Sequence, residues 1–317
     1  MSILYQPDSI RRKTDPVTAA LWFALYVVVV FVGGALLGGW LVRLGMAAES
    51  GVWHDLITEH GGSRVTRRVQ TVLAVLLGFW MLGRIGWQGL SDIGWDSLRS
   101  VDTRLRDVCR GFALGFGVIG LIFGIALTLG AREWEPFSMG SWMASIFRGF
   151  LITGLGVGLI EETLTRGVLY RSMARAWTPW IGAVVSSVLF AYAHFLKATP
   201  ESFDTGVFAV MVSSLTDGFA APHSLLKFFN MFLFGLVLCR FVQKRGDIWY
   251  AVGIHAAAVG LIRFISMQTN IASDRNPWIG HSAKFDDGWL LALLLCVVLV
   301  GLERFRSPSG EKLRVHL

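Results

Sequence analysis

The sequence predicts an all-α protein, a polytopic transmembrane bundle of about eight spans with both termini cytoplasmic. Of its 317 residues, 54% are apolar and only 16% are charged, whereas a soluble domain carries about 25% charged residues. Apolar stretches close to membrane-spanning length also recur along the whole chain. The mean hydropathy of +0.56 excludes a disordered chain and an ordinary soluble enzyme.

The expected spans follow the uncharged apolar runs in order. The first run has no charge over 26 residues or so, which is long enough to cross a bilayer with some tilt. The fourth run is expected to continue as helix beyond Ile160, because no helix breaker occurs before Pro179. The eight predicted spans are Val17–Val42, Val69–Gly86, Gly111–Gly130, Ser141–Ile160, Thr178–Leu196, Ser224–Cys239, Ile248–Ile265 and Gly288–Leu302.

Basic residues orient these spans. The net charge is +7, and most Lys and Arg fall on one side when the spans alternate from a cytoplasmic N-terminus. Arg64, Arg67 and Arg68 are the main exceptions. We therefore expect a multi-pass protein of the plasma (inner) membrane whose positive loops meet anionic lipids, not a nucleic-acid-binding protein.

The organisation along the chain suggests three regions. Residues 1–148 hold the N-terminal spans and an interfacial connector, Gln88–Arg110, in which apolar side chains alternate with Asp and Arg. Residues 149–265 hold the candidate catalytic helices, and residues 266–317 an outer loop, the last span and a basic tail. The segment Lys197–His223 is expected to be a partly buried loop. Small-xxx-small pairs such as Gly111/Gly115 and Gly154/Gly158 predict close helix packing.

Two adjacent carboxylates end the fourth apolar run. Glu162 and Arg166 are four residues apart, so on a helix they face each other as an ion pair. Glu161 lies about 100° further round the helix and has no such partner. Glu162 and Arg166 are therefore predicted to be structural, and Glu161 to be the free carboxylate that a general base requires.

Two histidines fall inside later spans. His194 follows Phe190 on the fifth span, on a stripe of small residues that is expected to face the bundle interior. His255 lies on the seventh span among Ala and Gly. A carboxylate base with two imidazoles could activate water and stabilise an oxyanion. The same residues, Glu161, His194 and His255, could instead bind zinc, and Glu161 could serve proton coupling in a transporter.

The order of these motifs resembles the CAAX-processing and bacteriocin-processing (CPBP, or Abi) family of intramembrane endopeptidases. The resemblance rests on Glu161-Glu162…Arg166, Phe190…His194 and His255-Ala256 and covers about a third of the chain. It implies a type II CAAX prenyl endopeptidase-like protease that hydrolyses membrane-associated or lipid-anchored peptides and proteins. It implies that Glu161 activates water, that His194 assists and that His255 helps to form the oxyanion hole. No cofactor is required in the glutamate mechanism, although zinc has also been assigned to the family.

One position departs from the family pattern. The family commonly has Asn four residues after the last His, where this chain has Val259. Asn230, on the preceding span, is the candidate substitute donor. The alternative is a catalytically weakened family member that acts as a membrane scaffold or immunity factor.

Overall fold

A computed structural model describes residues 15–304 except 49, 85–88, 96–99 and 273–275. The basic residues at 11–13 and the predicted basic tail lie outside this part. The described chain is mostly helical, as expected, with one small two-stranded sheet that the all-α prediction missed. It forms two compact units, which are described separately.

Unit 1 comprises the described residues within Gln88–Phe190 and Leu226–Leu317. Its central helix is α13 (Trp249–Gln268), which packs against α5 (Val101–Thr128) and against the helix that carries the Glu161–Arg166 motif. That helix runs continuously over Met139–Ala176, which confirms the predicted continuation beyond Ile160. Its successive parts are α6 (Met139–Ile146), η2 (Phe147–Val157), α7 (Gly158–Glu162), η3 (Thr163–Tyr170) and α8 (Arg171–Ala176).

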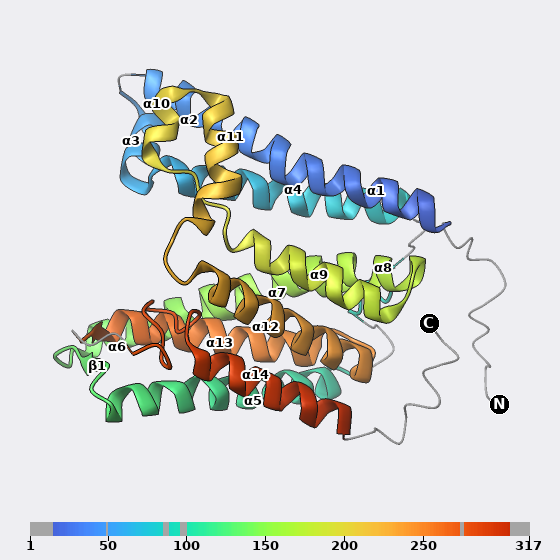
Figure 1. Ribbon diagram of the computed structural model, residues 1–317, viewed down its shortest axis with the longest axis vertical. Helices are drawn as coiled ribbons and strands as arrows, with labels where there is room; N and C mark the ends of the chain where they lie inside the picture. Colours follow the sequence, from blue (N-terminus) through green and yellow to red (C-terminus); the bar gives the residue numbers. More distant parts are fainter. Residues whose placement is uncertain (1–14, 49, 85–88, 96–99, 273–275, 305–317) are drawn as a thin grey trace. The chain divides into compact units, whose positions relative to one another are not determined.

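The remaining elements of unit 1 complete this bundle (Figure 1). They are α9 (Pro179–Ala193), α12 (Ser224–Arg245) and α14 (Trp289–Arg304), together with strands β1 (Arg132–Trp134) and β2 (Thr269–Ile271). The strands pair antiparallel, with Glu133 opposite Asn270. Three-residue strands carry too little periodicity to be recognised in a sequence. Most of the buried apolar core belongs to α12 and α13.

Glycines allow α5 and α13 to approach closely. A β-carbon at Gly111 would lie 2.1 Å from the carbonyl oxygen of Tyr250, and one at Gly115 would lie 2.4 Å from that of Ile254. Gly253 on α13 meets the carbonyl oxygen of Val108 in the same way, at 2.1 Å. The predicted contact role of Gly111/Gly115 is confirmed. Gly154 also touches α13, since a β-carbon there would lie 2.5 Å from the carbonyl oxygen of Ala256.

Unit 2 comprises the described residues within Lys13–Trp87 and Ala191–Leu225. Its long helices α1 (Pro16–Val28), η1 (Val29–Gly33) and α2 (Gly34–Ala47) form one run, which packs along α4 (Gly62–Arg84). The shorter elements are α3 (Val52–His60), α10 (Pro200–Thr205), α11 (Val207–Thr216) and η4 (Asp217–Phe219). Gly34 and Gly38 bring α2 onto α4, where their β-carbons would meet Gln70 and Thr66 at 2.7 Å.

Two segments that are expected to connect spans contain helix. The predicted loop Lys197–His223 contains the helices α10 and α11, and α11 packs on α2 through Val210. The second half of the predicted connector Gln88–Arg110 is the start of α5, because Ser100 caps a helix that continues without a break to Thr128. The charged residues of this part therefore lie in the first turns of a long helix.

Five helices among the described residues are long and apolar enough to cross a membrane. They are Val17–Ala47, Val101–Thr128, Met139–Ala176, Ser224–Arg245 and Trp249–Gln268. Pro179–Ala193 and Val207–Phe219 are shorter apolar helices. The protein is thus a helical membrane protein by length and composition.

Candidate active site

The motif helix changes its winding at the two carboxylates. Glu161 and Glu162 are the last residues of α7, and the wider π-helical turns of η3 begin at Thr163. The hydroxyl of Thr163 donates to the carbonyl of Leu159 at 2.7 Å, and that of Thr165 donates to the carbonyl of Glu161 at 2.6 Å. Insertions of π-helix occur frequently at functional sites, and here one begins directly after the carboxylates.

Glu162 is the most enclosed member of the site. Its side chain is 0% exposed, and its Oε1 atom accepts hydrogen bonds from the Arg166 guanidinium at 2.9 Å and from Nδ1 of His255 at 2.7 Å. The expected ion pair between Glu162 and Arg166 is therefore present. Because the carboxylate can only accept, Nδ1 of His255 carries a proton.

Glu161 faces the other nitrogen of the same imidazole. Its Oε2 atom lies 3.6 Å from Nε2 of His255, and its side chain is 35% exposed. The helix spacing alone leaves Glu161 without a partner, whereas the structure gives it a neighbouring imidazole from α13. His255 thus lies between both carboxylates, and of the two only Glu161 is open to solvent or substrate.

Aromatic rings enclose the buried charges. The Arg166 guanidinium carbon lies 4.4 Å from the centre of the Phe190 ring, which is a cation–π distance. The rings of Phe190 and Phe234 stand edge-on to the imidazole of His255, with centroids 5.9 and 5.6 Å away. Phe190, from the Phe190…His194 motif, contacts both the arginine and the histidine, which supports the structural role expected for it. Phe234 forms a second aromatic wall beside His255.

His194 and Asn230 differ from their expected settings. His194 follows the last residue of α9 and is exposed, because that helix ends at Ala193. It belongs to unit 2, whereas Glu161 and His255 belong to unit 1. The buried Nδ2 atom of Asn230 donates to the carbonyl oxygens of Asp286 at 3.0 Å and Gly288 at 2.9 Å. Both amide protons of Asn230 are thus engaged with backbone carbonyls in this structure.

Val259 lies one helical turn after His255 on α13 and is half-buried. An apolar side chain offers no hydrogen bond there. Among the described residues, no group of three or more His, Cys, Asp or Glu side chains is placed to hold a metal ion.

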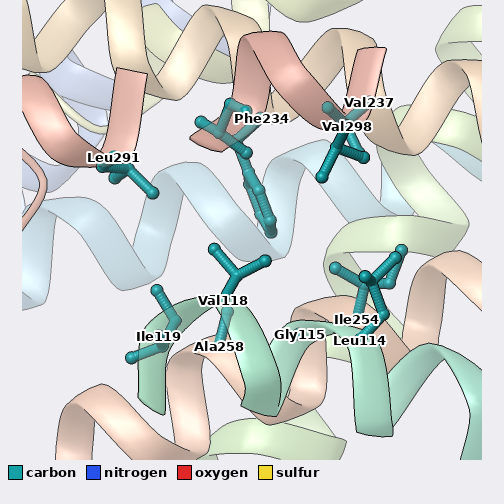
Figure 2. A pocket seen from close by; sticks show the side chains of 11 residues that line it. Leu114, Gly115, Val118, Ile119, Phe234, Val237, Ile254, Ala258, Leu291 and Val298 are labelled. Atoms are coloured by element: carbon teal, nitrogen blue, oxygen red, sulfur yellow. The ribbon is translucent and has the colours of Figure 1, made fainter. Parts of the chain in front are cut away.

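An apolar cavity of about 30 Å³ lies beside the site, between α5, α12, α13 and α14. Phe234 from α12 projects into it, opposite Val118 of α5 and Ala258 of α13 (Figure 2). No polar side chain lines this space. Because only apolar side chains line it, this space offers no hydrogen bond to a substrate or to water.

The fold and site define a helical membrane protein with a buried carboxylate–imidazole cluster. Residues 142–261 match the family described as type II CAAX prenyl endopeptidase Rce1-like. The chain therefore carries an Rce1-like domain, in agreement with the predicted CPBP resemblance. This domain contains Glu161, Glu162, Arg166, Phe190, His194 and His255. Neither the curated proteins nor the solved structures include a match to the chain.

Proposed function

We propose that the protein is an intramembrane endopeptidase that hydrolyses membrane-associated or lipid-anchored peptides with a water activated by Glu161. The observation that carries the proposal is the position of the His255 imidazole between a buried carboxylate and an accessible one. The Rce1-like domain supports a peptidase of the CAAX-processing type.

The proposed mechanism requires a proton on each nitrogen of His255. With the two carboxylates and the Arg166 guanidinium beside it, the charges of the cluster would then sum to zero, which limits the cost of burying them. Glu162 holds the Nδ1 proton, so that Nε2 can present a second proton toward the space beside Glu161. That proton is the donor that a developing oxyanion requires.

The proposed reaction uses these groups in two steps. Glu161 takes a proton from water as the water oxygen attacks the scissile carbonyl, and the Nε2 proton of His255 stabilises the resulting oxyanion. When the C–N bond breaks, Glu161 returns the proton to the leaving nitrogen, which gives a carboxylate and an amine. His194 is proposed to assist Glu161 in orienting the water, as the family resemblance implies.

Substitution of Glu161 tests the proposal. The purified full chain in nanodiscs is incubated with quenched peptide substrates, including one with a prenylated cysteine near its C-terminus. Glu161→Gln should reduce cleavage by at least about a hundredfold, the scale of general base catalysis, while His54→Ala in α3 should leave it unchanged. Cleavage that persists in Glu161→Gln contradicts the mechanism.

A second candidate function is that of a non-catalytic scaffold or immunity factor, and Val259 is the observation that favours it. Removing a single oxyanion donor costs about 100- to 1,000-fold in other hydrolases. If the site lacks only that donor, Val259→Asn should raise hydrolysis by about a hundredfold. If wild type and Glu161→Gln restore a deletion strain equally and neither cleaves peptides, the scaffold function is correct.

The proposed topology has about eight spans, with both termini cytoplasmic, in the plasma (inner) membrane. It adds α4, α9 and α14 to the five helices that are long and apolar enough to cross. The basic ends of α12 and α8, at Arg245 and Arg175, support a cytoplasmic position for that end of unit 1.

A further inference from the structure

A short turn between α4 and α5 lies on the active-site helices. Residues Gly89–Trp95, the 89–95 turn, are closed by backbone hydrogen bonds of 3.0 Å from Trp95 to Leu90 and from Gly94 to Ser91. Gly94 has a φ of +78°, a conformation that favours glycine. The turn belongs to unit 1, as α5 does, and it packs on the helices that carry the motifs.

Its last two residues bind two different helices. The indole Nε1 of Trp95 donates to the hydroxyl of Thr163 at 3.1 Å, directly after Glu162 on the motif helix. The carbonyl of Gly94 accepts from the backbone N–H of Ile248 at 3.2 Å, at the start of α13. The Trp95 ring also stands edge-on to Trp249, with centroids 5.4 Å apart. The turn thus joins the helix of Glu162 to the helix of His255.

Further contacts fix the turn on the motif helix. Buried Asp92 pairs with Arg175 at 3.2 Å, and its carbonyl accepts from Arg171 at 3.5 Å. A β-carbon at Gly167 would lie 2.7 Å from the carbonyl oxygen of Ile93. The backbone of the turn therefore touches η3 where only glycine leaves room.

We propose that the 89–95 turn sets the axial register between the motif helix and α13, and that Trp95 is a positioning residue for the Glu162–His255 hydrogen bond. A helix rises 1.5 Å per residue, so a slip of one residue between these helices would stretch the 2.7 Å bond beyond hydrogen-bonding length. With that bond lost, the Nε2 proton would no longer be directed beside Glu161. The catalytic consequence rests on the proposed function, whereas the positioning itself does not.

Substitution of Trp95 tests the register in the full chain. Trp95→Phe keeps the ring and removes its N–H, and should lower kcat about tenfold, the effect of about one hydrogen bond, with KM changed less than twofold. Thr163→Ser keeps the acceptor and should retain the wild-type rate. Thr163→Val should resemble Trp95→Phe, and the double variant should be no slower than the slower single variant.

A spectroscopic measurement tests the positioning role of Trp95 without depending on peptidase activity. In histidine-labelled protein in detergent micelles, the Nδ1 proton of His255 should give a low-field resonance, identified by its loss in His255→Gln. Trp95→Phe should shift or broaden that resonance. The control is Trp142→Phe at the other end of the motif helix, where the ring packs on Phe264, and it should leave the resonance unmoved.

The kinetic and spectroscopic experiments distinguish the proposed peptidase function from the proposed positioning role of Trp95. If the chain cleaves no peptide but Trp95→Phe moves the His255 resonance, the peptidase function fails and the positioning role stands. If Trp95→Phe leaves the resonance unchanged, or if Trp142→Phe changes it equally, the positioning role is overturned. A fall in thermal midpoint without a change in the resonance also overturns it, because the turn would then be merely structural.

Discussion

Glu162 shows how a single buried carboxylate can organise a site. It is fully enclosed, yet one of its oxygen atoms serves both a guanidinium and an imidazole. Isolated charges are too costly to bury, and the cost falls when each charge has hydrogen-bonded partners. The three side chains are therefore best regarded as one unit, in which removal of any member leaves the others uncompensated.

This interdependence predicts a large effect for Arg166. Arg166→Ala should destabilise the protein by about 3–5 kcal/mol, the cost of leaving a buried charge without its partner. Thermal unfolding in detergent measures the effect. The matched control is Arg110→Ala on α5, whose side chain is exposed and which should change stability by less than about 0.5 kcal/mol. Equal losses in the two variants would contradict the coupled unit.

At the residue scale, sequence spacing predicted only the local part of the site. The Glu162–Arg166 pair follows from a separation of four residues on a helix. The bond between Glu162 and His255 joins residues 93 positions apart, and no periodicity within one helix reports it. The contact between Trp95 and Thr163 cannot be predicted from spacing for the same reason, since it spans 68 positions.

At the element scale, α5 and α13 depend on the absence of side chains where they cross. Two glycines of α5, Gly115 and Gly117, are two residues apart but face different surroundings. A β-carbon at Gly115 would lie 2.4 Å from the carbonyl oxygen of Ile254, whereas one at Gly117 would have no atom within 4 Å. Such a contact can be relieved only if backbone moves.

The pair provides a matched comparison. Gly115→Ala should destabilise the chain by about 1–3 kcal/mol, because overpacking forces the helices apart. Gly117→Ala should be neutral or stabilising by up to about 1 kcal/mol, since alanine favours helix more than glycine does. Thermal midpoints of the purified variants in one detergent decide the matter. A Gly115→Ala variant as stable as Gly117→Ala would mean that the crossing tolerates displacement.

Helix existence was well predicted from hydropathy, but ends and special turns were not. Apolar runs predict the long helices, whereas the start of α5 is not predicted from hydropathy because its first turns carry Asp and Arg. The π-helical stretches η2 and η3 have no signal in apolar periodicity. Gly120 and Gly124, spaced like Gly111 and Gly115, make no close contact with a neighbouring backbone, so spacing alone does not identify a helix crossing.

At the scale of the whole molecule, the proposed orientation predicts which sites are reachable from outside the cell. Cys109 is exposed near the start of α5 and should face the cytoplasm. Glu135 follows β1 and is exposed, at the end that should face outward. A membrane-impermeant maleimide should label Glu135→Cys in intact cells, in a background without Cys109, Cys239 and Cys296.

The native Cys109 is the internal reference. Restored as the single cysteine, it should react only after the cells are permeabilised. If it reacts in intact cells while Glu135→Cys does not, the protein is inserted the other way round, and the proposed reaction would occur on the opposite side of the membrane.

The length of the motif helix indicates how deep in the bilayer a substrate would have to reach the site. From Met139 to Glu161 the helix covers about 30 Å, which is the full thickness of the hydrocarbon layer. In the proposed topology Glu161 consequently lies toward the cytoplasmic side of the bilayer, as does His255, which lies six residues, or about 9 Å, after the start of α13. A polypeptide tethered by a lipid would then be cut close to its anchor, and its polar ends would not have to enter the centre of the hydrocarbon layer.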